Sequence, residues 1–410
     1  MTDRHQRIRK HQLWLKTLPL LLVPMMVSAH GPARAPDAGE RAIVFPDTAE
    51  YKTLTVDLHT HSVFSDGHVW PKIRVEEALR DGLDAIAITE HLEYQPHRYE
   101  IEHADRNRAA AIAAQAASDT DLMVINGSEI TREAPAGHMN AVFITDANKL
   151  LNVSEPPPNT ADADPRDYYL AAGQWPAQAA VDAAVAQGAF VFWNHPYWTR
   201  QQPDGIARIN DFHANNARAG KLHGIEIANG QDYSAEAHQI ALDHDLTLIG
   251  VSDVHDLIDW DHPPTEGQHR PVTLVLATER SPAALREALF AKRTLVWFRN
   301  LLIGREAELT AMLEASISIT SARYRRDDQV LELDISNQSD ARFLLRNTSS
   351  MTFMHHADLI EIAPNEVTRL AVKPGAILNE ITLPFVVENA LLAPEAHPTI
   401  TLRSSISAHE

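Results

Sequence analysis

The stretch Asp57-Leu58-His59-Thr60-His61-Ser62 directly follows an apolar, β-branched run, and Ser65-Asp66-Gly67 comes shortly after it. Residues two apart in a strand point to the same side of a sheet, so His59 and His61 can bind one ion together. A single His-x-His pair is a weak metal signature. Whether His59 and His61 indicate a metal site therefore depends on further ligand-type residues elsewhere in the chain.

Similar clusters of metal-binding residue types recur along the chain. They are Thr89-Glu90-His91, Gly127-Ser128-Glu129, Gly137-His138, Trp193-Asn194-His195-Pro196 and Ser252-Asp253-Val254-His255. In nearly every case an apolar run comes immediately before the polar cluster, which is typical of the point where a strand ends and a loop begins. The sequence therefore predicts that these side chains gather at the ends of several strands.

The composition of the chain excludes several kinds of partner and of metal ligand. The 410 residues carry 36 Lys+Arg against 55 Asp+Glu, a formal charge of -19, which disfavours sequence-independent binding to nucleic acid or to an anionic membrane. Cysteine is absent, so thiolate metal sites, disulfides and cysteine nucleophiles are excluded. Metal ligands must therefore be imidazole and carboxylate groups.

The N-terminus has the pattern of a secretory signal, with basic residues before an apolar run at 18–27 and small residues after it. We predict a signal peptide at 1–35, a linker at 36–50 and a periplasmic or secreted product with no membrane attachment after cleavage. An uncleaved anchor is the alternative, but the run is shorter than the ~20 residues that span a bilayer.

The rest of the chain predicts two domains. Strands are expected at 53–58, 85–89, 122–126, 139–144, 189–193, 224–228, 247–252 and 272–277, and helices at 71–80, 106–117, 176–187, 235–244 and 282–292. This alternation predicts a parallel sheet closed into a barrel over 51–304, where sites gather at the carboxyl ends of the strands. Two inserts, 152–169 and 256–270, are expected to be surface loops, one or both over the site. Short alternating runs over 305–410 predict a small β-sandwich.

Taken together, these motifs resemble the PHP (polymerase and histidinol phosphatase) superfamily over about residues 50 to 300. The resemblance implies an α/β fold, a distorted barrel of seven strands and helices, and two to three divalent metal ions. By position, His59, His61, Glu129 and Asp253 would bind a first metal, and Glu129 would bridge to a second held by His138 and His195. Asp66, His91 and His255 would bind a third.

The chemistry of these ligands fits the family. Imidazole and carboxylate suit Mn, Zn or Fe, and a carboxylate shared by two ions allows a bridging hydroxide to act as nucleophile at neutral pH. We assign catalytic roles to Glu129 and Asp253, and list Arg132 and Arg200 as candidates for contacting a phosphate oxygen. Solvated arginines are an equal alternative for the last two. The chain departs from the family pattern in two places: Glu90 stands where the family often has Asp, which changes the supporting hydrogen bond made there, and Asp66 stands at a third-metal position that varies between His and Asp.

The leading hypothesis is a metal-dependent hydrolase of small-molecule phosphoesters, leaning to phosphodiesters because Tyr197, Trp198 and the inserts offer walls for a second substituent. The alternatives are a phosphomonoesterase on the same site, an amidohydrolase-type hydrolase, and a non-catalytic periplasmic metal-binding protein. An amidohydrolase usually needs a bridging lysine, whereas Glu129 occupies that place here. No nucleic-acid partner is expected, and a homo-oligomer stays open.

Three groups of polar residues stand apart from the predicted ligands. Asp57 is expected to support a ligand rather than bind metal, and Glu226 is either structural or part of the pocket lining. Other histidines are expected to be solvated or locally bonded: His68, His244, His269, His355 and His356. The C-terminal strands carry no chemical motif and predict a scaffold or a dimer surface.

Overall fold

The apolar runs form the strands of one large, curved sheet. The computed structural model describes residues 41–101, 104–264, 268–326 and 329–407, so the predicted signal peptide and the start of the linker lie outside the described residues. Twelve strands make up the sheet: β1(Lys52–Asp57), β2(Ala85–Ile88), β3(Met123–Thr131), β4(His138–Val142), β5(Phe190–Trp193), β6(Gly224–Asn229), β7(Asp232–Tyr233), β8(Thr247–Val251), β9(Val272–Ala277), β10(Thr294–Phe298), β11(Leu301–Gly304) and β19(Ala390–Leu391).

The sheet is mixed, whereas the sequence predicted a parallel one. Strands β1, β2 and β3 run parallel, as do β5, β6 and β8, but β4 pairs antiparallel with both of its neighbours and β9 pairs antiparallel with β1. Only residues 132–137 join β3 to β4, and a parallel connection needs a crossover of a dozen residues or more. The α/β class is confirmed, and the strand directions are corrected.

The sheet curves until β8 meets β9 and β10, where threonine side chains bridge the strands. The hydroxyl of Thr273 donates to the carbonyl of Gly250 at 2.9 Å, and that of Thr294 donates to the carbonyl of Leu248 at 2.9 Å. The approach is so close that a Cβ at Gly250 would collide with Val296. Glycine therefore permits the closure.

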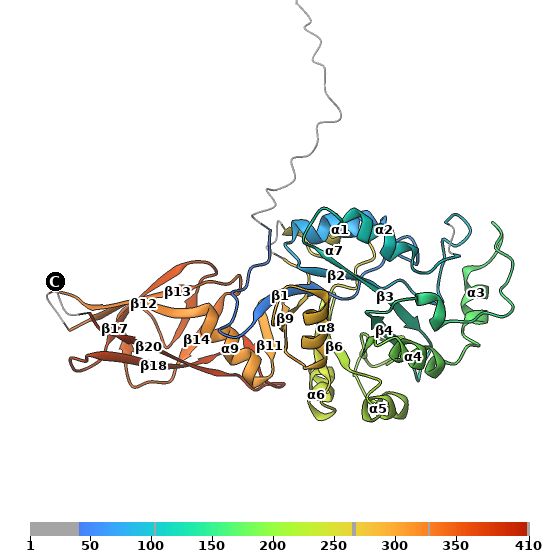
Figure 1. Cartoon of the computed structure of the whole chain (residues 1–410). Helices are drawn as coiled ribbons and strands as arrows, with labels where there is room; N and C mark the ends of the chain where they lie inside the picture. Colours follow the sequence, from blue (N-terminus) through green and yellow to red (C-terminus); the bar gives the residue numbers. More distant parts are fainter. Residues whose placement is uncertain (1–40, 102–103, 265–267, 327–328, 408–410) are drawn as a thin grey trace, which may run out of the picture. The chain divides into compact units, whose positions relative to one another are not determined.

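Helices cover the outside of this sheet, and α1 and α2 lie over β2 (Figure 1). The helices are α1(Pro71–Arg80), α2(Arg108–Ala116), α3(Pro165–Ala172), α4(Ala177–Ala186), α5(Asp211–Arg218), α6(Ala235–Asp243), α7(Ile258–Asp261), α8(Pro282–Phe290) and α9(Glu306–Ser316), with a 3-10 helix η2(Ala147–Leu150). Capping explains several starts: the side chain of Ser281 accepts from the backbone N–H of Ala284, with proline in the first turn of α8. No helix among the described residues is long and apolar enough to span a membrane.

Part of the insert at 152–169, predicted as a loop, is helical. Asp164 accepts a hydrogen bond from the backbone N–H of Arg166, and Pro165 occupies the first turn of α3. Both are standard helix-start signals, so the run of prolines before them masked a helix that begins at Pro165.

The C-terminal region forms two four-stranded sheets, as predicted for a β-sandwich. One contains β12(Ile317–Tyr324), β13(Leu331–Asn337), β17(Val367–Lys373) and β15(Thr352–Phe353), and the other β16(Leu359–Ile362), β14(Phe343–Asn347), β18(Glu380–Val387) and β20(Thr399–Ser405). Burial alternates strictly along β13, as expected when one face of a strand packs on a core.

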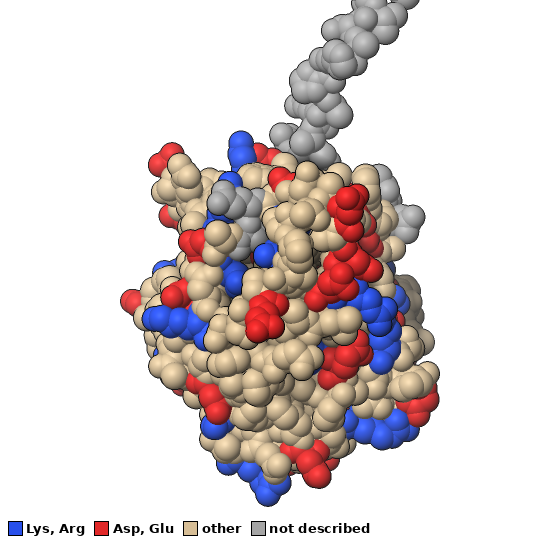
Figure 2. All heavy atoms as spheres, turned by 90° about the vertical axis from the view of Figure 1, so that its right-hand side faces the viewer, with Lys and Arg blue, Asp and Glu red and all other residues tan. Residues whose placement is uncertain are grey.

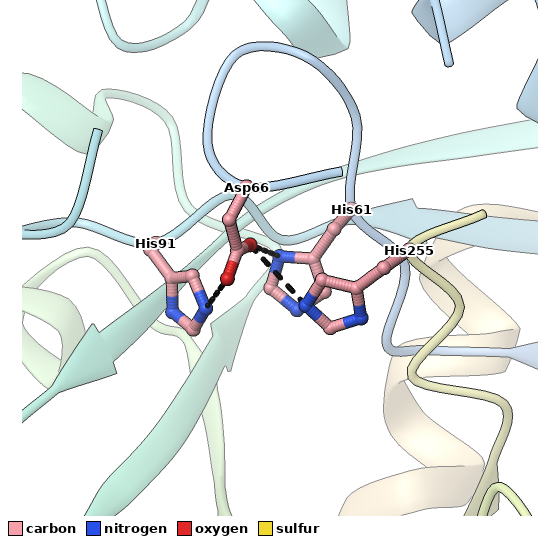
Figure 3. A group of neighbouring side chains, drawn as sticks. All are labelled: His61, Asp66, His91 and His255. Carbon is pink, nitrogen blue, oxygen red and sulfur yellow. Dashed lines mark ion pairs between the residues drawn. The ribbon is translucent and has the colours of Figure 1, made fainter. Parts of the chain in front are cut away.

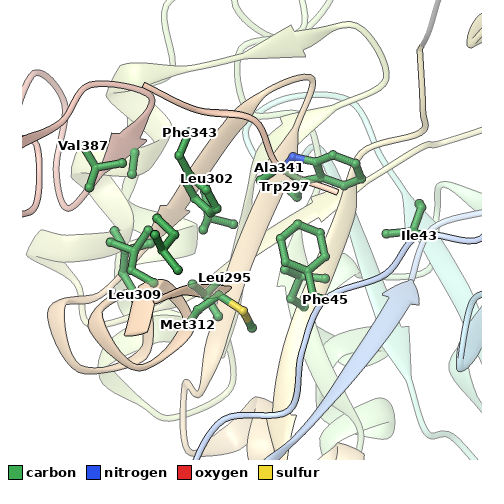
Figure 4. Close-up of a cluster of buried hydrophobic side chains, with 14 of the residues drawn as sticks. Ile43, Phe45, Leu295, Trp297, Leu302, Leu309, Met312, Ala341, Phe343 and Val387 are labelled. Atoms are coloured by element: carbon green, nitrogen blue, oxygen red, sulfur yellow. The ribbon is translucent and has the colours of Figure 1, made fainter. Parts of the chain in front are cut away.

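One hydrophobic cluster joins the sandwich strands to the large sheet. Figure 4 shows Leu302 of β11, Leu309 and Met312 of α9, Phe343 of β14 and Val387 of β18 in this cluster. In addition, β19 follows the sandwich strand β18 in sequence yet pairs with β11 of the large sheet. The boundary predicted at 304/305 stays a prediction, since β19 lies beyond it in sequence and still belongs to the large sheet.

Candidate metal centre

The predicted ligands converge at one edge of the large sheet. His59 and His61 follow β1, His91 follows β2, Glu129 lies near the end of β3, His195 follows β5, and Asp253 and His255 follow β8. His138 instead begins β4. Because β4 is antiparallel to its neighbours, its first residue lies at the same edge as the last residues of the parallel strands. The mixed sheet therefore brings these eight residues to one edge, and Asp66 reaches them from the loop after β1.

His59, His61 and Asp253 form the first group, in which both histidines are fully buried. The Nε2 atoms of His59 and His61 are 3.0 Å apart, and Oδ1 of Asp253 lies 3.1 Å from the first and 3.2 Å from the second. A carboxylate accepts and cannot donate, so Nδ1 of His59 donates to Glu226, and Nε2 is the ring nitrogen that faces the site. This nitrogen, the second imidazole and the carboxylate of Asp253 face one point, which suits a divalent cation.

Glu129 lies between this group and a second one. Its Oε1 is 3.0 Å from Nδ1 of His138 and 3.5 Å from Nε2 of His195, and it accepts a hydrogen bond from Asn194 at 2.8 Å. Its two oxygens are also each 3.7 Å from an Nε2 atom of the first group. The side chain is fully buried, and it occupies the position that a bridging carboxylate requires.

Asp66 organises a third, more open group. Figure 3 shows its carboxylate between His91 on one side and His61 and His255 on the other. Its oxygens lie 3.3 Å from Nε2 of His91 and 3.2 Å from Nε2 of His255. The side chains of Asp66 and His255 are 27% and 33% exposed, whereas those of His59 and Glu129 are fully buried. This group is therefore the one most open to solvent.

Two histidines each lie between two groups, whereas the sequence assigned each of them to a single metal. His61 faces both the first and the third group, and His91 contacts Glu129 as well as Asp66. The centre is therefore one continuous cluster of shared ligands.

The electrostatics of the cluster also fit a bound cation. Burial alone would raise the pKa of Glu129, but His91, His138 and His59 lower it well below its usual range. Conversely, burial would lower the pKa of His59, and Asp253, Glu226 and Glu129 raise it well above its usual value. The carboxylates thus demand positive charge at the centre, which divalent metal ions supply.

The backbone is held in unusual conformations at two ligands. His195 has φ +27° and Asp253 has φ +53°, in the left-handed region that side chains other than glycine rarely adopt. Such conformations cost free energy and persist where the surrounding structure imposes them, most often at functional sites.

Several residues outside the predicted ligand set hold this centre in place. Asp57 accepts from the hydroxyl of Ser252 at 2.6 Å and from Arg270 at 3.0 Å, which is the supporting role predicted for it. Glu90 accepts hydrogen bonds from both Ser62 and Ser65, so the longer acid at this position ties down the loop that carries Asp66.

Glu226 was left open between two roles by the sequence. It is fully buried and bonded to His59 and to the backbone of His195. The sequence signal for this buried role was a glutamate between two isoleucines in a strand.

A cavity of about 830 Å³ opens above the cluster. Its walls include Tyr94, Arg132, Asp164, Arg166, Tyr169, Tyr197, Trp198 and Arg200. The ring of Trp198 lies 5.2 Å from that of His138 and 5.3 Å from the guanidinium of Arg200. The insert that contains α3 therefore does line the site, whereas residues of the second insert line a different cavity.

The two candidate arginines differ. Arg132 is buried, its Nη1 lies 2.5 Å from Glu93, and its Nη2 donates to the carbonyl of Trp175 at 2.8 Å. It is therefore not a solvated arginine. Arg200 is exposed at the cavity wall.

Comparison with known proteins identifies two domains. The PHP domain matches residues 57–174, and an Ig-like domain matches residues 317–403. A solved structure from Bacteroides vulgatus, described as a two-domain protein containing a predicted PHP-like metal-dependent phosphoesterase, is 37% identical. The likeness covers 88% of this chain and 98% of that chain, with a TM-score of 0.76. Among curated proteins, none matches this sequence.

Two further solved structures are much less similar. An amidohydrolase from Chromobacterium violaceum with bound sulfate is 17% identical over 59% of this chain and 97% of its own, with a TM-score of 0.36. A lesion-specific endonuclease from Pyrococcus furiosus is 13% identical over 66% of this chain and 62% of its own, with a TM-score of 0.37. Likenesses this weak carry no argument about this chain.

The curved α/β sheet and its edge of imidazoles and carboxylates define a barrel protein with a centre for divalent metals. The extent of its likeness to the Bacteroides vulgatus protein identifies the family. The chain belongs to the PHP family, as its motifs predicted.

Proposed function

We propose that this chain is a metal-dependent hydrolase of small-molecule phosphoesters that prefers phosphodiesters. The observation that carries the proposal is the convergence of nine ligand-type side chains under one open cavity. The description of the Bacteroides vulgatus relative as containing a predicted metal-dependent phosphoesterase supports the same reaction class.

The chain's own residues divide the work. Two or three ions of Mn, Zn or Fe, when bound, supply Lewis acidity and a hydroxide nucleophile at neutral pH. Glu129 holds the two most buried groups at a fixed separation, and Asp253 completes the first of them. Arg200, at the cavity wall, provides positive charge for a phosphate oxygen. Arg132 also lines the cavity, and its ion pair with Glu93 fixes its orientation.

The walls of the cavity favour diesters. A diester carries one charge and two substituents, so its second substituent needs an apolar surface, whereas a dianionic monoester needs a dense positive cradle. Trp198 stands beside His138 and His195, and Tyr94 and Tyr169 pack edge to face on another part of the lining. These rings can flank a substituent on each side of the metal centre.

The test compares a monoester and a diester of one chromogenic alcohol, with the metal content of the purified protein measured in parallel. We expect the diester to have the higher kcat/KM, and Trp198→Ala to lower kcat/KM for the diester by roughly tenfold through lost packing. Replacement of Phe290, an exposed ring outside the cavity lining, with Ala is the control. A higher kcat/KM for the monoester would favour the phosphomonoesterase alternative.

Other functions have less support. An amidohydrolase would place a lysine where this centre has Glu129, and a non-catalytic protein has no need of a cavity over its ligands. On the face drawn in Figure 2, basic and acidic side chains are interspersed over the described residues, without a broad basic tract. That distribution supports a small-molecule substrate over nucleic acid.

We further propose that the protein acts outside the cytoplasm, because basic residues and an apolar run open the sequence. Sequencing the N-terminus of the mature protein tests this. Cleavage after Ala29 or Ala35 is expected, and recovery of an intact N-terminus in the cytoplasm would contradict it.

A further inference from the structure

Glu226 is a fully buried carboxylate that belongs to none of the three ligand groups, yet it contacts two of them. Its Oε1 lies 2.7 Å from Nδ1 of His59. Its Oε2 accepts a hydrogen bond from the backbone N–H of His195 at 2.7 Å and another from the side chain of Asn229 at 2.8 Å. Three donors therefore converge on one carboxylate.

The network extends to a third ligand. The amide nitrogen of Asn229 also donates to Oδ2 of Asp253 at 3.2 Å. Glu226 thus acts directly on His59 and His195 and, through Asn229, on Asp253. Both His195 and Asp253 have positive φ angles, and these hydrogen bonds are among the contacts that hold them there.

The strand is shaped for this arrangement. In a regular strand, residues three apart point to opposite faces, so Glu226 and Asn229 would not meet. The register between β6 and β8 shifts between Glu226 and Ala228, which inserts one extra residue into β6. A bulge of this kind turns the following side chains over, and it brings Asn229 to the face that carries Glu226.

We propose that Glu226 is a positioning residue of the metal centre, which fixes the tautomer of His59 and anchors His195 and Asp253. A carboxylate accepts and cannot donate, so it requires the proton of His59 to sit on Nδ1 and leaves Nε2 free for a metal ion. The inference rests on the proposed metal-dependent function.

Glutamine is the sharpest test because it has the same shape but only one accepting oxygen. If its oxygen faces His59, its NH₂ group meets the donors of His195 and Asn229. If its NH₂ group faces His59, the imidazole must move its proton to Nε2, where the metal ion would bind. In either orientation Glu226→Gln opposes metal binding.

The experiment measures affinity and stoichiometry for Mn²⁺ and Zn²⁺ by competition with a chromogenic chelator, together with circular dichroism. Glu226→Gln is expected to weaken the tightest binding by about 10- to 100-fold while the fold is retained. The matched control is Asp84→Asn, which also turns a carboxylate into an amide. Asp84 accepts from the backbone of Thr55 at 2.8 Å, before β2 begins and at the opposite end of the sheet from the site. The metal affinity of the Asp84→Asn variant should match that of the unmodified protein.

Two results would overturn the inference. If Glu226→Gln binds metal as tightly as the unmodified chain, Glu226 has no positioning role. If the unmodified chain itself binds no metal, the proposed function fails and this inference fails with it. Should Glu226→Gln not fold, Asn229→Leu removes the bond to Asp253 and one of the three bonds to Glu226, and it leaves the contact between Glu226 and His59 in place. It is expected to weaken binding by less, and unchanged affinity in that variant would contradict the network.

Discussion

The buried groups around Glu129 and the open group around Asp66 use the same residue types in different surroundings. His59, His61 and Glu129 are shielded from water, and hydrogen bonds from neighbouring strands fix their orientation. Asp66 lies on a loop and is reached by solvent, as is His255. Interactions in the buried groups are stronger and less adjustable, because the local dielectric constant is low. Under the proposed function, the buried groups would activate the hydroxide and the open group would make the adaptable contact with substrate.

The largest effect should come from the residue that links the buried groups. Glu129→Gln removes a negative charge from between two cation positions and is expected to lower turnover at least ~100-fold. The measurement is kcat with a phosphodiester substrate. His244→Gln, at the end of α6, is the control and should change little. Equal effects of the two substitutions would contradict the assignment of Glu129.

The second prediction distinguishes the buried groups around Glu129 from the open group around Asp66. His59→Asn should empty the buried groups of metal, whereas Asp66→Asn should leave them filled and remove only the open-site ion. If the open site stabilises charge on a phosphate oxygen or the leaving group, as the proposed function requires, Asp66→Asn should slow substrates with poor leaving groups roughly 10- to 100-fold more than those with good ones. Elemental analysis and rates for paired leaving groups measure both.

If Asp66→Asn loses all metal, or slows every substrate equally, the two regions do not divide the work as described.

The metal ions should leave the open group before they leave the buried groups. During dialysis against a chelator, the ion at the solvent-reached group is expected to leave first, and the buried ions later. Turnover of substrates with poor leaving groups should therefore fall before that of good ones. Timed samples analysed for metal content and activity test this, and simultaneous loss of all ions would mean that the centre acts as one unit.

The smallest effect concerns the packing behind the site. His213 stacks on Trp193 of β5 at 3.9 Å between ring centroids, and burial lowers its pKa to about 3 from an ordinary value of 6.5. The unfolded chain therefore binds a proton below pH 6.5 while the folded chain does not, so this contribution to stability is present above pH 6.5 and is lost as pH falls toward 3.

From pH 7 to pH 5 the loss should be about 2 kcal/mol. Urea unfolding of the natural chain and of His213→Phe at both pH values measures it, since phenylalanine keeps the ring and removes the titration. An identical pH dependence in both proteins would show that His213 does not titrate in this way.

The sequence predicted the parts of this protein that depend on local pattern. Strand positions followed from apolar runs, so the strand expected at 272–277 is β9 itself and most others differ by one or two residues. The ligand candidates followed from residue type, because without cysteine only imidazole and carboxylate groups can bind these metals. Strand direction did not follow, since apolar runs look alike in parallel and antiparallel strands. The helix beginning at Pro165 was hidden by the prolines of its own loop.

By itself, the sequence determined the α/β class, the appended β domain, the PHP family and the nine residues that gather at the metal centre. Only the tertiary structure decided which groups share ligands, that Arg132 is buried against Glu93, and that Glu226 faces His59. Glu226 and His59 are 167 positions apart. Contacts over such separations depend on strand order, on the reversed direction of β4 and on one extra residue in β6, none of which a local pattern of residue types encodes.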